Sequence, residues 1–184
     1  MYVWTAINID NQLQEIKALA QKIEKEIGFE SSALTLPSHV SLKISFSVND
    51  ADYPHVIETL LDYYKTVKPF WIDVECIEIE NNIVWIRMNE NSMLNQIHKD
   101  LDRILFEKHD IVPHPFDLDF KFHSTLFLDS KKEKIEMAYN RIKDAKFPLS
   151  LCADKFIIGK SPSGKIGTYH VTHTIDLLKN EYTT

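Results

Sequence analysis

The sequence predicts an α+β domain with two lobes, each a largely antiparallel sheet with flanking helices. Apolar residues recur at helical spacing in several segments, and segments of alternating apolar and polar residues lie between them. Strand, helix and hairpin also follow one another in the same order in both halves of the chain. We therefore interpret residues 1–184 as one bilobed domain with a pseudo-two-fold arrangement and a central cleft.

The first elements follow from the period of the apolar residues. Residues 2–9 are rich in β-forming side chains and predict a strand. Residues 11–27 have the spacing of an amphipathic helix, with Asp10 as its expected N-cap and Gly28 as its end. In residues 38–47 the period changes to two, which predicts a half-buried strand with one polar face.

The same reasoning predicts the remaining elements, in chain order: a helix over 52–67, strands over 70–79 and 83–88, a helix over 91–108, a loop over 109–118, a strand over 119–128, a helix over 131–145, and a hairpin formed by 148–158 and 166–175. Asn81-Asn82 suits the turn of the first hairpin. The hairpin aromatics Trp85 and Tyr169 are as far apart in sequence as His39 and His123, which supports the comparison of the two halves.

Composition excludes several classes of protein. The chain is 44% hydrophobic, with four Gly and seven Pro, which argues against a disordered or fibrous protein. A net charge of −6 argues against a protein that coats long nucleic acid through a basic face. It leaves room for a small basic cleft on an acidic body.

Cysteine use and the N-terminal residues indicate the compartment. Cys76 and Cys152 lie in apolar, strand-like segments, so we expect two buried thiols, with a single structural disulfide as the alternative. The N-terminal residues lack a basic region followed by a long apolar one, and no apolar run approaches the roughly 20 residues of a membrane span. We expect a cytoplasmic monomer.

Two predicted strands carry matching polar residues on one face. His39, Ser41 and Lys43 alternate along the first strand, and Lys121, His123, Thr125 and Phe127 do so along the second. If the halves face each other, two imidazoles and two hydroxyls converge. Such a site suits phosphoryl chemistry: one imidazole removes a proton from the attacking oxygen, the other protonates the leaving oxygen, and the hydroxyls bind phosphate oxygens.

Chance has to be weighed against this interpretation. The triplet His-x-Ser/Thr is expected roughly once in a chain of this composition, and this chain has three. The third is His170-Val171-Thr172, whose histidine has no counterpart in the first half. The matched positions of His39 and His123 favour these two histidines, and we expect a supporting or structural role for His170.

The segments around both histidines resemble a known family. Pro37-Ser38-His39-Val40-Ser41-Leu42 and Phe122-His123-Ser124-Thr125-Leu126 are similar to the paired motifs of the two-histidine (2H) phosphoesterase superfamily. These are the LigT-like proteins, which include 2′-5′ RNA ligases and cyclic phosphodiesterases. The resemblance implies a bilobed LigT-like fold and an enzyme that needs no metal or other cofactor.

What the resemblance implies for the site is specific. His39 and His123 would form the acid–base pair, in an order that we leave open, and Ser41 and Thr125 would hold phosphate oxygens. The substrate would be a 2′,3′-cyclic phosphate or a 2′-5′ phosphodiester of a nucleotide or short RNA. The alternatives are a non-catalytic RNA- or nucleotide-binding module of the same fold, and a metal-dependent hydrolase.

Further residues are weaker candidates for substrate binding. Lys43 would add a cation near the phosphate, or be a solvated lysine on an open strand face. Phe127 and Tyr169 would stack on a base, or fill the core. We interpret His109 and His114 as surface residues because no Cys or carboxylate stands at ligand spacing beside them.

Overall fold

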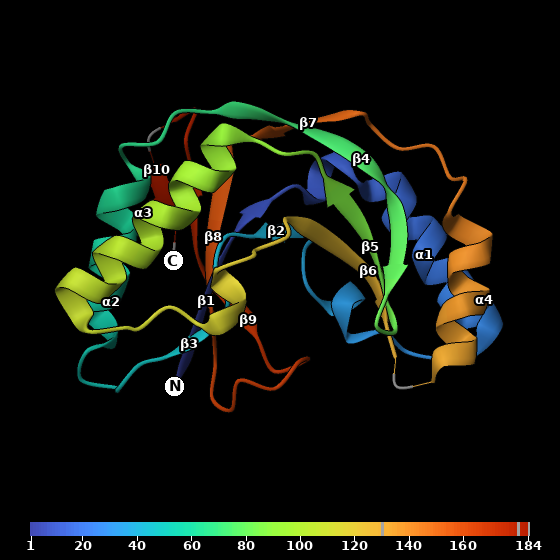
Figure 1. Ribbon diagram of the computed structural model, residues 1–184, viewed down its shortest axis with the longest axis horizontal. Coiled ribbons are helices and arrows are strands. Elements are labelled where there is room, and N and C mark those ends of the chain that lie inside the picture. The colour runs from blue at the N-terminus through green and yellow to red at the C-terminus, as the bar shows by residue number, and fades with distance from the viewer. Residues whose placement is uncertain (130, 180, 184) are drawn as a thin grey trace.

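The computed structural model describes residues 1–129, 131–179 and 181–183, and its strands form two antiparallel sheets (Figure 1). The first sheet has the spatial order β10 (Glu181–Thr183), β9 (His170–Asp176), β8 (Lys155–Ser161), β1 (Tyr2–Asn8) and β2 (His39–Ser41), with β3 (Phe46–Ser47) also paired to β1. The second has the order β6 (His123–Leu128), β5 (Ile83–Met88), β4 (Phe70–Glu80) and β7 (Ser150–Ala153). The predicted α+β class is confirmed.

Each sheet is covered by helices on one side (Figure 1). The helices α1 (Gln14–Ile27) and α4 (Lys132–Ile142) pack on each other and on the second sheet. The helices α2 (Tyr53–Tyr64) and α3 (Ser92–His109) pack together beside the first sheet. The ring of Tyr64 stacks on Phe156 of β8 at 4.3 Å, and its hydroxyl is 2.6 Å from that of Thr5 on β1. Three short 3-10 helices, η1 (Asp10–Gln12), η2 (Ser32–Thr35) and η3 (Pro115–Asp117), complete the described elements.

The two halves of the chain exchange strands, which the sequence comparison did not predict. The histidine strand of the second half, β6, pairs with β5, which belongs to the hairpin of the first half. The hairpin β8–β9 of the second half joins β1 and β2 in the first sheet. Residues 150–153, predicted within that hairpin, pair with β4 instead. The shared order of elements in the two halves therefore does not correspond to one sheet for each half, because element order alone does not determine strand pairing.

Local features of the sequence explain where elements begin and end. Asn81 and Asn82 both have positive φ, at 48° and 64°, as a two-residue type I′ turn requires. Gly28 ends α1 in the left-handed conformation, with φ of 77°. Both histidine strands are shorter than predicted. Residues 42–45 interrupt the first one, and the second begins only at His123.

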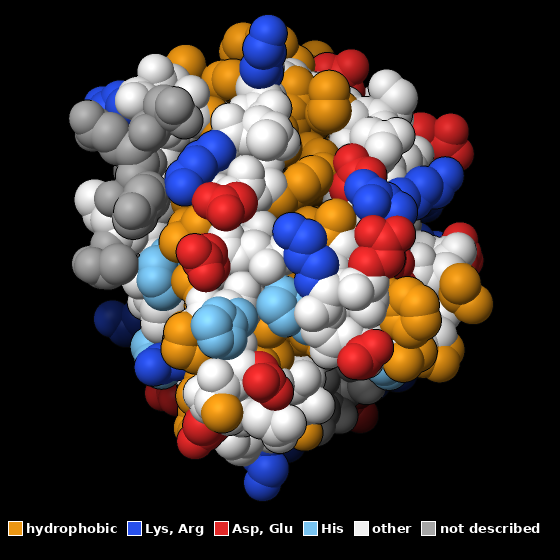
Figure 2. Space-filling model, turned by 90° about the vertical axis from the view of Figure 1, so that its left-hand side faces the viewer, with side chains coloured by type: hydrophobic (Ala, Val, Ile, Leu, Met, Phe, Trp, Pro, Cys, Tyr) orange, Lys and Arg blue, Asp and Glu red, His pale blue; other side chains and the backbone are white. Residues whose placement is uncertain are grey.

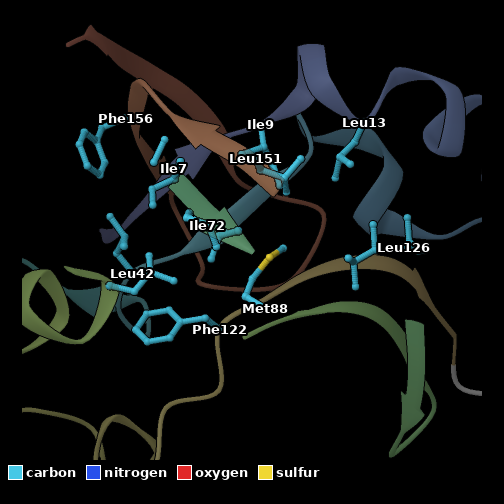
Figure 3. Close-up of a cluster of buried hydrophobic side chains, with 14 of the residues drawn as sticks. Ile7, Ile9, Leu13, Leu42, Ile72, Met88, Phe122, Leu126, Leu151 and Phe156 are labelled. Atoms are coloured by element: carbon cyan, nitrogen blue, oxygen red, sulfur yellow. The ribbon is translucent and has the colours of Figure 1, made fainter. Parts of the chain in front are cut away.

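A shared core joins the sheets. Buried apolar side chains from both sheets and all four α-helices form one cluster. Figure 3 shows part of it, with side chains contributed by Ile7 of β1, Ile72 of β4, Leu126 of β6 and Phe156 of β8, among others. Each fully buried side chain of this size contributes about 1.5–3 kcal/mol. This continuous packing holds the two sheets in one arrangement.

The surface shows no long run of one charge on the face over α2 and α3. Figure 2 shows lysine and arginine side chains interspersed with aspartate and glutamate on that face. Among the described residues, no helix combines the length and the apolar character needed to cross a membrane. Cys76 and Cys152 are both free thiols and are partly exposed rather than buried.

Candidate active site

The two histidine strands meet where the sheets adjoin. β2 is at the edge of the first sheet and β6 is at the edge of the second, and the two strands lie side by side (Figure 1). The first residue of each strand is a histidine, and a charge on His123 lowers the pKa of His39. Ser41 and Thr125 lie on the same strands, and all four side chains are partly exposed. We call these four residues the junction site.

Strand register places the junction-site residues. His39 is opposite Asn8 and Ser41 is opposite Ala6, so both side chains lie on one face of the first sheet. On the second sheet, His123 is opposite Arg87 and Thr125 is opposite Trp85. The alternation predicted from the sequence therefore holds for these histidine and hydroxyl pairs.

His39 is held through its Nδ1 atom. This nitrogen donates to the carbonyl oxygen of Pro37 at 2.7 Å, which leaves Nε2 available for proton transfer. The indole of Trp4 meets the imidazole edge-on, with ring centroids 4.6 Å apart. Trp4 Nε1 also donates to the hydroxyl oxygen of Ser41 at 3.1 Å. The hydroxyl hydrogen of Ser41 is thereby free to donate to a ligand oxygen.

His123 is held in a closely matching way. Its Nδ1 donates to the carbonyl oxygen of Lys121 at 2.7 Å, again two residues earlier in the chain. The indole of Trp85 lies against the imidazole, with ring centroids 4.2 Å apart. Trp85 Nε1 donates to Oε1 of Glu78 at 2.6 Å. Each imidazole thus has one nitrogen fixed to the backbone, a tryptophan as its neighbour, and Nε2 left for chemistry.

Gly159 makes room for the first tryptophan. This residue is opposite Trp4 in the β1–β8 pair. A Cβ atom at Gly159 would lie 2.6 Å from a carbon of the Trp4 ring, which is closer than side chains approach. The absence of a side chain at Gly159 lets the indole lie over β8 while it contacts His39.

Burial lowers the pKa of both imidazoles. The pKa of His39 falls to about 4, mainly because burial penalises the charged form, and the charge of His123 lowers it further. The pKa of His123 is also lowered by burial, but the hydrogen bond to the backbone carbonyl of Lys121 and the charges of Glu78 and Glu80 oppose that shift. The electrostatic surroundings of the two histidines therefore differ, although their geometry matches. A bound phosphate would raise the pKa of both, because an anion favours imidazolium.

Lys43 is a correction to the sequence analysis. Because β2 ends at Ser41, the alternation stops and the side chain of Lys43 turns toward α3 and η3. It is only 2% exposed and forms ion pairs with Asp102 and, at 2.8 Å, with Asp117. Its ammonium is enclosed by these carboxylates and is not available to a ligand at the junction site.

Phe127 is a second correction. The register of β5 and β6 shifts between Val84 and Trp85, so Thr125 is opposite Trp85 while Phe127 is opposite Val84. This bulge reverses the alternation after Thr125. Phe127 is completely buried and packs on Phe29, with ring centroids 5.7 Å apart. It is a core residue and cannot stack on a base.

Tyr169 and His170 lie on the β8–β9 hairpin. The ring of Tyr169 is 6.3 Å from that of Trp4, so this tyrosine borders the tryptophan that contacts His39. Its role as a base-stacking residue stays a prediction. His170 is exposed on β9, a strand that is separated from β2 by β8 and β1.

Sequence reasoning missed Trp4, Glu78 and Arg87 as neighbours of the histidines. Arg87 is opposite His123 on β5, and its guanidinium pairs with Glu75 at 3.0 Å and Glu78 at 3.4 Å. For Glu78 and Arg87 the available signal was their alternation with apolar residues, whereas Trp4 lies in a run of five buried residues and carried no such signal. The alternation of polar and apolar residues does not predict which strands pair with the two histidine strands.

One group of potential metal ligands lies away from the junction site. His98, Asp102 and Asp117 place ligand atoms within 4.8 Å of one another. The ammonium of Lys43 binds both carboxylates and already supplies a positive charge there. A cavity of about 650 Å³ borders this group, lined mainly by residues 43–49 and 108–115, and neither His39 nor His123 lines it. His109 is bonded to Thr59 at 2.8 Å, and His114 caps η3.

Structural comparison identifies the fold. The chain superposes on TT0787 of Thermus thermophilus with a TM-score of 0.67 and 15% identity, over 96% of this chain and 98% of that one. It superposes on apo LigT of E. coli with a TM-score of 0.60 and 17% identity, over 95% and 96%. The chain has the LigT-like fold.

Other comparisons agree with the LigT-like fold. Usb1 of Kluyveromyces marxianus superposes with a TM-score of 0.52 and 15% identity, over 96% of this chain and 98% of that one. A protein of Halalkalibacterium halodurans named "Putative phosphoesterase BH1439" is 28% identical over 85 residues, which are 43% of this chain and half of the relative. No family model matches the sequence.

Proposed function

We propose that this protein is a phosphodiesterase that hydrolyses a 2′,3′-cyclic phosphate or a 2′-5′ phosphodiester of a nucleotide or short RNA. The observation that carries the proposal is the matched pair of imidazoles. Each is fixed through Nδ1 to the backbone two residues earlier and leaves Nε2 for proton transfer. Two hydroxyls, on Ser41 and Thr125, accompany them on the same strand faces.

The chemistry needs one imidazole in each protonation state. The neutral imidazole accepts a proton from water on Nε2 as the water oxygen forms a bond to phosphorus. The phosphorus–oxygen bond to the ribose then breaks, and the imidazolium donates its Nε2 proton to that leaving oxygen. The products are a phosphomonoester and a free hydroxyl, and the two histidines have exchanged protonation states. Ser41 and Thr125 donate hydrogen bonds to the phosphate oxygens as negative charge develops on them.

Two further findings support a nucleotide as the substrate class. Structures of E. coli LigT, which has this fold, are described as complexes with phosphate, with ATP and with 3′-AMP. The net charge of −6 favours a ligand with few phosphates over a long nucleic acid.

The decisive experiment is a substrate panel. Purified protein would be incubated with 2′,3′-cyclic nucleotides, 2′-5′ dinucleotides and short RNAs with cyclic phosphate ends, each with and without a chelator. We expect turnover of at least one class that chelator leaves unchanged. Binding without turnover of any class would indicate a nucleotide-binding module instead. Activity abolished by chelator and restored by one metal would indicate a metal-dependent hydrolase.

A further inference from the structure

Glu78 connects to His123 across three neighbouring strands. It lies on β4 opposite Trp85 of β5, and Trp85 is opposite Thr125 of β6. Its Oε1 accepts the indole N–H of Trp85 at 2.6 Å, and its Oε2 accepts from Arg87 at 3.4 Å. Trp85 is only 8% exposed, and its ring lies 4.2 Å from the imidazole of His123. The carboxylate therefore fixes the aromatic wall of this histidine.

At His39, the neighbouring tryptophan donates its indole N–H to a neutral group and not to a carboxylate. Trp4 donates its indole N–H to the neutral hydroxyl of Ser41. The charged groups that act on His39 besides His123 are Lys17 and Asp10, and these two form an ion pair with each other at 2.7 Å. Their opposite charges largely cancel at His39. The tryptophan beside His123 therefore donates its indole N–H to a charged acceptor, and the tryptophan beside His39 donates to a neutral one.

The charged groups around His123 come from three strands and the segment before β6. Glu78 and Glu80 come from β4, Arg87 from β5, Lys121 from the segment before β6, and His39 from β2. Arg87 is paired with both Glu75 and Glu78, and Lys121 is paired with Glu80. Of these groups, Glu78 and Glu80 favour the charged form of His123, against the burial that lowers its pKa.

We infer that Glu78 is a positioning residue for His123: it holds Trp85 against the imidazole, and its charge favours the protonated ring. Resting on the proposed function, this makes His123 the proton donor to the leaving oxygen and His39 the acceptor of the proton from water. The pKa of His39, lowered to about 4, agrees with a neutral acceptor in the free enzyme.

The test replaces Glu78 with glutamine. Glu78→Gln keeps the length of the side chain and an oxygen that accepts the Trp85 N–H, and removes only the charge. The imidazole pKa values would be measured by NMR titration, with signals assigned through His39→Asn and His123→Asn. We expect the pKa of His123 to fall by roughly 0.5–1 and that of His39 to stay nearly unchanged. Glu58→Gln, an exposed position on α2, is the matched control and should move neither value.

This titration needs no turnover, so its outcome is independent of the proposed function. An unchanged pKa of His123 in a folded Glu78→Gln protein would overturn the inference. If that variant does not fold, the wild-type titration decides: His123 must titrate at a higher pH than His39, and the reverse order refutes the inference. With an active substrate, Glu78→Gln should move only the alkaline limb of the kcat/KM profile, and it should move to lower pH. A shift of the acid limb instead would assign the donor role to His39.

Discussion

Replacing Lys43 with methionine tests whether this lysine stabilises the fold or binds substrate. The structure encloses its ammonium between Asp102 and Asp117, and the side chain of Asp117 is completely buried. Methionine fills a similar volume, so the main cost is a buried carboxylate without its cation. Loss of one partner from such a pair costs about 3–5 kcal/mol.

The details of the network favour the lower end of that range. Asp117 also accepts backbone N–H groups from Ile44 at 3.0 Å and His114 at 2.7 Å, which remain in the variant. Asp102 is partly exposed and can be hydrated. We therefore expect Lys43→Met to lower the free energy of unfolding by about 3 kcal/mol, which lowers Tm by roughly 6–12 °C.

The pH dependence of this loss provides a second check. Hydrogen bonds and the Lys43 charge hold the pKa of Asp117 below its ordinary value, although burial opposes this. The ion pair therefore stabilises the fold at any pH above the ordinary Asp pKa. This stabilisation is lost as the pH falls through the lower pKa of the folded state. In Lys43→Met that stabilisation is absent, so the difference from wild type should be largest near pH 7 and shrink in acid.

Urea denaturation at a series of pH values from 7 down to about 2.5, below the ordinary Asp pKa, measures both effects. Lys22→Met serves as the control, because Lys22 pairs with the exposed Glu26 at 4.0 Å, and loss of this ion pair should cost less than about 0.5 kcal/mol. The reasoning fails if Lys43→Met is as stable as wild type at pH 7 while KM for the active substrate rises.

Three more predictions concern the junction site. His39→Ala and His123→Ala should each lower kcat/KM by about 10²–10⁴ in steady-state assays, and the double variant should lose far less than the product of the two single losses. His170→Ala should change kcat/KM little, and a loss as large as that of His39→Ala would contradict the choice of histidines. Gly159→Ala should displace the indole of Trp4 from His39 and lower the free energy of unfolding by about 1–3 kcal/mol, measured by thermal or urea denaturation. An unchanged stability would contradict the close approach of Trp4 to Gly159. Because the pKa of His39 is lowered to about 4 in the folded state, this histidine is protonated at higher pH in the unfolded chain, so the free energy of unfolding should decrease as the pH falls from about 6.5 toward 4. Urea denaturation of wild type and His39→Asn over this pH range checks this, since the free energy of unfolding should fall less steeply with pH in the variant.

The sequence could predict most elements because their signals are local. The helical spacing, the Asn81-Asn82 turn and the stop at Gly28 each depend on a few neighbouring residues. Alternation placed His39 with Ser41 and His123 with Thr125 on common faces, and the register confirms this.

The errors arose where a strand stopped being regular. Phe127 lies beyond a bulge in β6, and a bulge shifts every later side chain to the opposite face without any composition that marks it. Lys43 lies just beyond the end of β2, where partners on α3 and η3 determine its direction. Glu78 and Trp4 became neighbours of the site only through strand pairing, which depends on contacts distant in sequence.

The exchange of strands between halves also bears on how the chain folds during synthesis. The four strands of the second sheet lie within residues 70–153, a continuous stretch that can pair as it leaves the ribosome. β1 cannot complete its pairing at that stage, because its long partner β8 spans residues 155–161 and is made after the whole second sheet. Until then one edge of β1 is unpaired, although its other edge can bind β2. We expect the second sheet to acquire protection from hydrogen exchange first, and a nascent chain stalled before β8 to be prone to aggregation through the open edge of β1.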